Sequence, residues 1–117
     1  MGMRIKEKIE NHVAILSLSG KMMGGPETTA LHDHIRGLVN DGINKVVIDL
    51  SGVKWINSSG LGVLMAVMTT LKNAGGMMKL ANITEKVESL LMITQLMRIF
   101  ETFDSVERAV ASLTEEK

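Results

Sequence analysis

Short apolar runs and helical apolar stripes follow one another along this chain. Two strands are predicted first, at residues 4–9 and 12–19, joined by a tight turn at Glu10-Asn11. Both faces of the second strand carry apolar residues, which is typical of a strand inside a sheet. Further strands are expected at residues 45–50, 77–81 and 99–103, with a helical pattern before each of them.

Each predicted helix has a recognisable start. Pro26 occupies the first position of the first helix, which Gly42 is expected to end. The second helix covers residues 59–73, Thr84 caps the third, and a capping box at residues 104–107 opens the last. Strands that alternate with helices predict an α/β fold of about two layers. We expect a mixed sheet of four to five strands with an antiparallel edge, and about four helices.

The centre of the chain contains the candidate site. A buried strand pattern at residues 46–50 leads through Asn57-Ser58-Ser59-Gly60 into an apolar helix. Ser58 is predicted to be the N-cap of this helix, because its hydroxyl can accept hydrogen bonds from free amides of the first turn. This hydroxyl would lie near the carboxyl end of a strand, where α/β proteins tend to bind ligands. A helix N-terminus there also favours negative charge.

Composition narrows the classes of function. The chain has 117 residues, which is one domain, over residues 1–117. Lysine plus arginine and aspartate plus glutamate both number 13, so no strong field attracts nucleic acid or an anionic membrane. There is no cysteine, and the apolar stretch at residues 61–68 is shorter than the roughly 20 residues that span a bilayer. We expect a cytoplasmic protein without membrane insertion that meets a partner through shape and apolar contact.

Other candidate chemistry is weak. His32 and His34 are two residues apart on a predicted helix and face different directions, so no shared metal site is expected. A Gly-x-Ser-x-Gly motif is absent, which argues against Ser58 as a catalytic nucleophile and against an enzyme. No cofactor is expected. Trp55 is interpreted as a packing residue. The ten methionines indicate an adaptable core, with a methionine-rich partner surface as the second interpretation.

The segments Asp49–Val53 and Ile56–Leu64 together resemble the signature of STAS domains, in particular small free-standing anti-sigma factor antagonists. The similarity extends to Leu18-Ser19-Gly20 at a strand end, to the Gly75-Gly76 turn and to Leu91–Phe100. The resemblance implies phosphorylation of Ser58, with Ser59 as the second choice, by a serine-protein kinase of the histidine-kinase-like ATPase fold. In that family the kinase is also the anti-sigma factor. The unphosphorylated antagonist binds it and frees the sigma factor, until phosphorylation ends the complex and a metal-dependent serine phosphatase resets it.

The resemblance also implies a partner surface around this serine. We expect it to include Met22, Met23, Gly24, Asn57, Ser58, Ser59, Gly60, Leu61 and Gly62. Asn57 departs from the family, which usually has aspartate there, and Lys21-Met22-Met23 replaces an often acidic segment. Both differences remove negative charge.

Three alternatives remain open from the sequence. Residues 57–60 could be only a cap and a turn. The chain could be a STAS module outside sigma control, in another partner-switching pathway or a multiprotein complex. It could also be a small nucleotide-binding domain that uses the same helix N-terminus for a phosphate.

Overall fold

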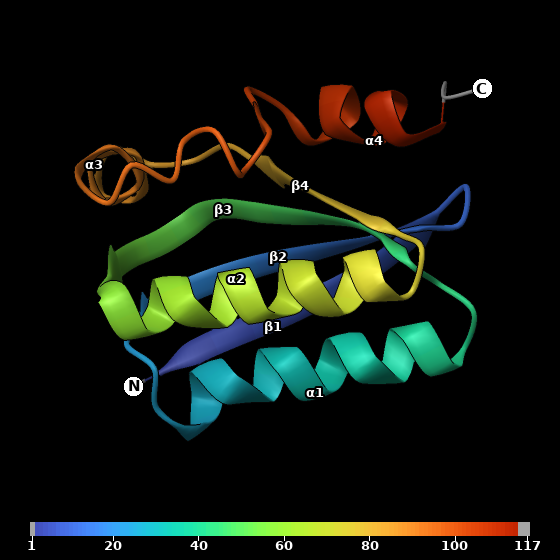
Figure 1. The fold of residues 1–117 in the computed structure, drawn as a ribbon, viewed down its shortest axis with the longest axis horizontal. Helices are drawn as coiled ribbons and strands as arrows, with labels where there is room; N and C mark the ends of the chain where they lie inside the picture. Colours follow the sequence, from blue (N-terminus) through green and yellow to red (C-terminus); the bar gives the residue numbers. More distant parts are fainter. Residues whose placement is uncertain (1, 115–117) are drawn as a thin grey trace.

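One mixed sheet organises the domain, as shown by a computed structural model that describes residues 2–114 (Figure 1). Its five strands lie side by side in chain order: β1 (Met3–Glu10), β2 (Val13–Met22), β3 (Lys45–Ile56), β4 (Met77–Ala81) and β5 (Thr102–Phe103). The helices are α1 (Pro26–Asn40), α2 (Ser58–Asn73), α3 (Glu85–Ile93) and α4 (Val106–Thr114). β1 is antiparallel to β2, and all other neighbours are parallel. The predicted α/β class and the mixed sheet are confirmed.

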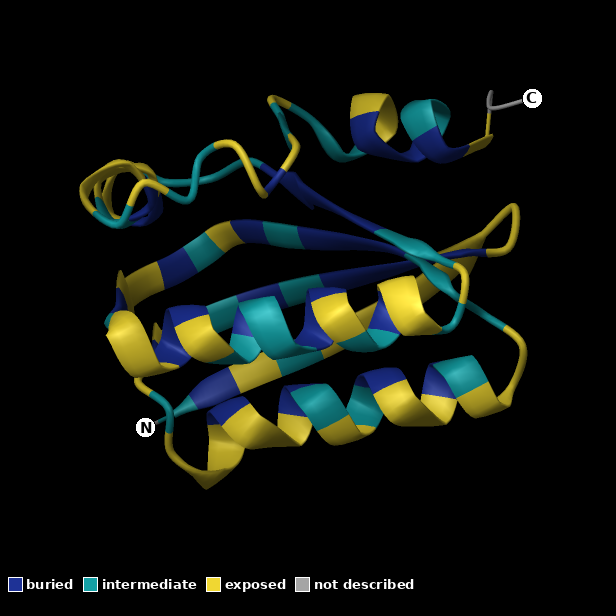
Figure 2. Cartoon of the chain, in the orientation of Figure 1, coloured by how far each residue is buried: buried dark blue, intermediate teal, exposed yellow. Residues whose placement is uncertain are grey.

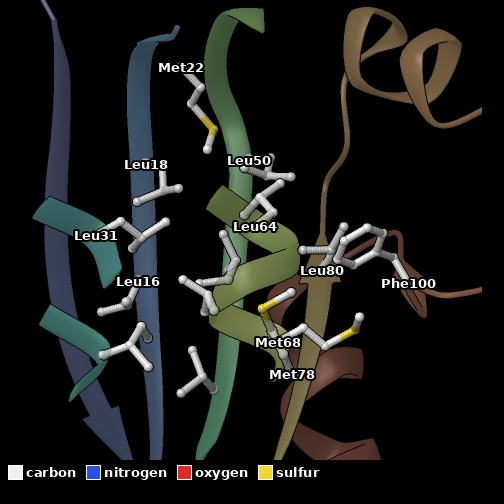
Figure 3. Packing of buried hydrophobic residues seen from close by; sticks show 14 of the residues in the cluster. Leu16, Leu18, Met22, Leu31, Leu50, Leu64, Met68, Met78, Leu80 and Phe100 are labelled. Atoms are coloured by element: carbon white, nitrogen blue, oxygen red, sulfur yellow. The ribbon is translucent and has the colours of Figure 1, made fainter. Parts of the chain in front are cut away.

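Helices cover both faces of the sheet. α1, α2 and α3 share the main core with one face, where leucines such as Leu16, Leu64 and Leu80 are fully buried (Figure 3). α4 lies on the other face (Figure 1). Its Leu113 belongs to a smaller buried cluster on that face. The sheet and the helices α1 to α3 form the two expected layers. α4 adds a third layer, made of a single helix, on the opposite face of the sheet. Within residues 2–114 no helix is long and apolar enough to cross a membrane.

Several element boundaries differ from the sequence predictions. The first turn lies at Asn11 and His12, whose φ angles are 54° and 66°, so His12 belongs to the turn and not to β2. Two residues with positive φ give a hairpin turn whose twist matches that of the strands. β5 contains only Thr102–Phe103, because Phe100 turns into the main core instead of extending the strand.

β3 continues well past the predicted end at Leu50 and leads directly to the candidate site. Its pairing with β2 is shifted twice, once after Ser17 and once after Gly20. At each shift β3 contains one more residue than β2, as in a β-bulge. These extra residues let β3 stay paired with β2 until Ile56, and Asn57 then starts the turn into α2.

Candidate functional site

Asn57, and not Ser58, caps the candidate helix. Its side-chain Oδ1 accepts a hydrogen bond from the Gly60 amide at 2.9 Å, and α2 begins at Ser58. The predicted cap was wrong by one residue, because β3 extends to Ile56 and the helix starts directly after the next residue. Asparagine caps helices as well as serine does. Ser58 therefore occupies the first helical position, where it is exposed and its hydroxyl is not needed as the cap. Figure 2 shows the start of α2 in the colour of exposed residues.

The end of β2 packs closely against this helix start. The Asn57 amide nitrogen of the main chain donates to the Met22 carbonyl at 3.3 Å, and the Asn57 side chain donates to the Met23 carbonyl at 3.4 Å. A Cβ atom on Gly60 would lie 2.0 Å from the Met22 carbonyl oxygen. A Cβ atom on Gly24, whose φ is +87°, would lie 2.4 Å from the Ser59 Cβ. Both positions therefore require glycine.

The structure brings the predicted partner-surface residues together, but it does not expose them equally. Ser58, Ser59 and Gly62 are exposed, and Met23 keeps 42% of its surface accessible. Met22 and Leu61 are 0% and 3% exposed, so their side chains belong to the core. The expectation that these two side chains face a partner is therefore corrected. Their role is to fix the backbone that carries the exposed residues.

The first turn of α2 has no acidic residue, so its helix dipole is uncompensated. Free amides and the positive end of the dipole therefore lie at the helix start, where Ser58 is the first residue. A negative group added to this hydroxyl would be stabilised by the helix start. The geometry suits a serine that carries a covalent phosphate.

Comparison with known proteins decides the family. The STAS domain matches residues 4–109 of this chain. The chain belongs to the STAS domain family. This confirms the resemblance noted in the central segment, and it covers nearly all of the described fold.

Anti-sigma factor antagonists are among the relatives of this STAS domain. A putative anti-sigma factor antagonist of Thermotoga maritima is 36% identical over 72 residues, which are 62% of this chain and 64% of the relative. An anti-sigma F factor antagonist of Paenibacillus polymyxa is 25% identical over 118 residues, 95% and 97% of the two chains. The crystal structure of a putative antagonist from T. maritima has a TM-score of 0.82 and 30% identity, with 93% of each chain covered.

A hollow of about 330 Å³ lies between α1 and α2 of the STAS domain, next to the helix start. His32, Arg36 and Ser59 are among its lining residues. The His32 Nε2 is 2.6 Å from the Thr70 hydroxyl, and this contact joins the two helices. Burial lowers the pKa of His32, with a smaller effect from the Arg36 charge.

The histidines are held apart from one another. His34 meets Glu7 on β1 at 2.5 Å, whereas His32 is bound to Thr70 on α2. Within the described residues, no three histidine, cysteine, aspartate or glutamate side chains form a group that could hold a metal ion.

Trp55 was assigned to packing from the sequence, yet 45% of its surface is exposed. The Lys86 ammonium lies 4.3 Å from the centre of its ring. The predicted strand ended at Leu50, whereas β3 extends to Ile56, so the sequence prediction assigned Trp55 to no face of the sheet. Sequence reasoning therefore missed an aromatic residue on the surface, three residues before Ser58.

Proposed function

We propose that this STAS domain is an anti-sigma factor antagonist whose partner is an anti-sigma factor with serine-protein kinase activity and the histidine-kinase-like ATPase fold. Phosphorylation of Ser58 by this kinase ends the complex, and a metal-dependent serine phosphatase restores it. The protein acts by binding and is not itself an enzyme. The observation that carries the proposal is the exposed Ser58 hydroxyl at the first position of α2, left free of capping by Asn57.

The helix start suits a phosphate on the free domain. A phosphate adds about −1.5 to −2 charges at neutral pH. At a helix N-terminus such a charge is stabilised by about 0.3–1 kcal/mol. Because Asn57 supplies the cap, modification of Ser58 does not remove it. We therefore expect the phosphorylated domain to remain folded.

The same phosphate is costly in a protein interface. Burial of a charge without a partner costs several kcal/mol. Each 1.4 kcal/mol changes a dissociation constant about tenfold, so the complex weakens by orders of magnitude. The switch thus acts on the affinity for the kinase and not on the stability of the antagonist.

Intact-mass measurement after incubation with candidate kinases and ATP tests the proposal. One added phosphate is expected on the natural protein and on the Ser59→Ala variant, and none on Ser58→Ala. Ser59 is the matched control because it is the adjacent exposed serine of the same helix turn. A phosphate that persists in Ser58→Ala contradicts the assignment.

If every kinase that forms a complex with the protein fails to phosphorylate it, the proposed switch is contradicted. Thermal unfolding with and without ATP, in the absence of any kinase, distinguishes our proposal from the alternative of a nucleotide-binding domain. A ligand that binds only the native state must raise the melting temperature. Under our proposal ATP alone leaves the melting temperature unchanged.

A further inference from the structure

A bulge near the end of β3 turns Trp55 out of the core. Gly20 of β2 pairs with Val53, and the next β2 residue, Lys21, pairs with Trp55, so Lys54 is the extra residue. Val53 and Ile56 are 1% and 8% exposed and belong to the same core cluster, although they are three positions apart. In a regular strand, residues on one face are two or four positions apart. The bulge therefore places Trp55 on the outer side of the strand.

Lysines surround the exposed ring. Lys21 is its paired neighbour on β2, Lys54 precedes it in β3, and Lys86 of α3 lies over the ring at 4.3 Å. All three lysines are exposed. We call these four residues the tryptophan patch. Its nearby acidic residues are Glu27, which lines a hollow together with Lys21, and Glu85, which precedes Lys86.

The tryptophan patch is continuous with the surface around Ser58. Ser58 is only three positions after Trp55, so their Cα atoms are at most about 11 Å apart. This is close to the distance of about 8–10 Å over which charges act at ordinary salt concentrations. On the other side, Met22 pairs with Ile56, and the exposed Met23 follows it. A protein that covers Ser58 is therefore within reach of Trp55.

We propose that Trp55 anchors the partner kinase, which would receive the ring in an apolar pocket with acidic side chains around it. This inference rests on the function proposed above and names a second part of the same partner surface. Tryptophan is among the residues that contribute most to binding when buried in an interface. The lysines supply charge that complements an acidic rim.

The patch also supplies a reason for release after phosphorylation. A phosphate on Ser58 is attracted to the same lysines and repels the acidic groups of the partner. The modification therefore weakens the contact at Trp55 as well as the contact at Ser58.

Trp55 is the only tryptophan of the chain, so its fluorescence reports on this position alone. For each candidate kinase we would form the complex, verify it by size-exclusion chromatography and measure acrylamide quenching. A variant of the kinase without tryptophan ensures that the measured fluorescence comes from Trp55 alone. Quenching of Trp55 should fall at least threefold in the complex, with a shift of the emission to shorter wavelength.

Calorimetric titration of variants gives an independent measure. Trp55→Ala should weaken binding about thirtyfold or more, which is the effect that defines a binding hot spot. Lys86→Gln should weaken it several-fold and reduce its dependence on salt. Ile93→Ala is the matched control, since Ile93 is 79% exposed on the same helix as Lys86, and its affinity should stay within twofold.

The outcomes separate the two proposals. A complex with unchanged quenching of Trp55 overturns the anchor and leaves the proposed function intact. Failure to bind any kinase overturns both. If Trp55→Ala does not fold, the quenching measurement on the natural protein still decides, and Trp55→Phe provides a folded variant with reduced contact area.

Discussion

Asn57 uses both ends of its side-chain amide at the start of α2. The oxygen accepts from the Gly60 amide, and the nitrogen donates to the Met23 carbonyl at 3.4 Å. An aspartate at this position could make the first contact but not the second, because a carboxylate only accepts. The asparagine therefore links the loop after β2 to the helix that carries Ser58.

Replacement of Asn57 distinguishes these two contacts. Asn57→Ala removes the cap and should lower the free energy of unfolding by about 1 kcal/mol. Asn57→Asp keeps the cap and adds a charge that the helix dipole favours, so its stability should stay within about 0.5 kcal/mol of the natural protein. Urea denaturation measures both values. Equal losses in the two variants would show that the Met23 contact, and not the cap, stabilises this turn.

At the scale of the element, α2 has two glycines with opposite surroundings. Gly60 approaches the Met22 main chain, whereas a Cβ on Gly62 would meet nothing within 4 Å. Gly60→Ala should therefore destabilise the domain by about 1–3 kcal/mol through overpacking. Gly62→Ala should stabilise it by about 0.5–1 kcal/mol, because alanine favours helices. Denaturant unfolding of the two variants tests this, and similar effects would contradict the close contact.

The existence of every element could be predicted from the apolar pattern, but several boundaries could not. The end of β3 depends on its pairing with β2, and the bulge at Lys54 depends on two segments that lie far apart in the chain. This is why the cap was placed on Ser58 and why the exposure of Trp55 was missed. The motif at Ser58 was visible because all of its residues are adjacent in the sequence.

For the whole molecule, the contact between α1 and α2 should make stability depend on pH. Burial lowers the pKa of His32 in the folded state below its ordinary value of 6.5, and the Arg36 charge adds to this, while Asp33 opposes it. The unfolded chain therefore takes up a proton at a higher pH than the folded one does. The resulting contribution to stability is present above pH 6.5 and decreases as the pH falls below it.

Urea denaturation between pH 8 and pH 5 would measure this effect. The natural protein should lose more stability over that range than His32→Gln, whose side chain is never protonated. The difference between the two curves isolates His32 from the carboxylates that titrate at lower pH. Parallel curves for the two proteins would contradict a role for His32.

The contact between Met22–Gly24 and Asn57–Gly60 joins segments that lie on opposite sides of α1 in the chain. In the folded protein they meet where the parallel pairing of β2 with β3 ends, and α1 lies between the two strands in the chain. A ribosome releases the first segment well before the second, so a growing chain does not yet present the surface around Ser58. A kinase that must contact both segments would not bind or phosphorylate unfinished and misfolded molecules. Under the proposed function, newly made protein would therefore be folded before Ser58 could be phosphorylated.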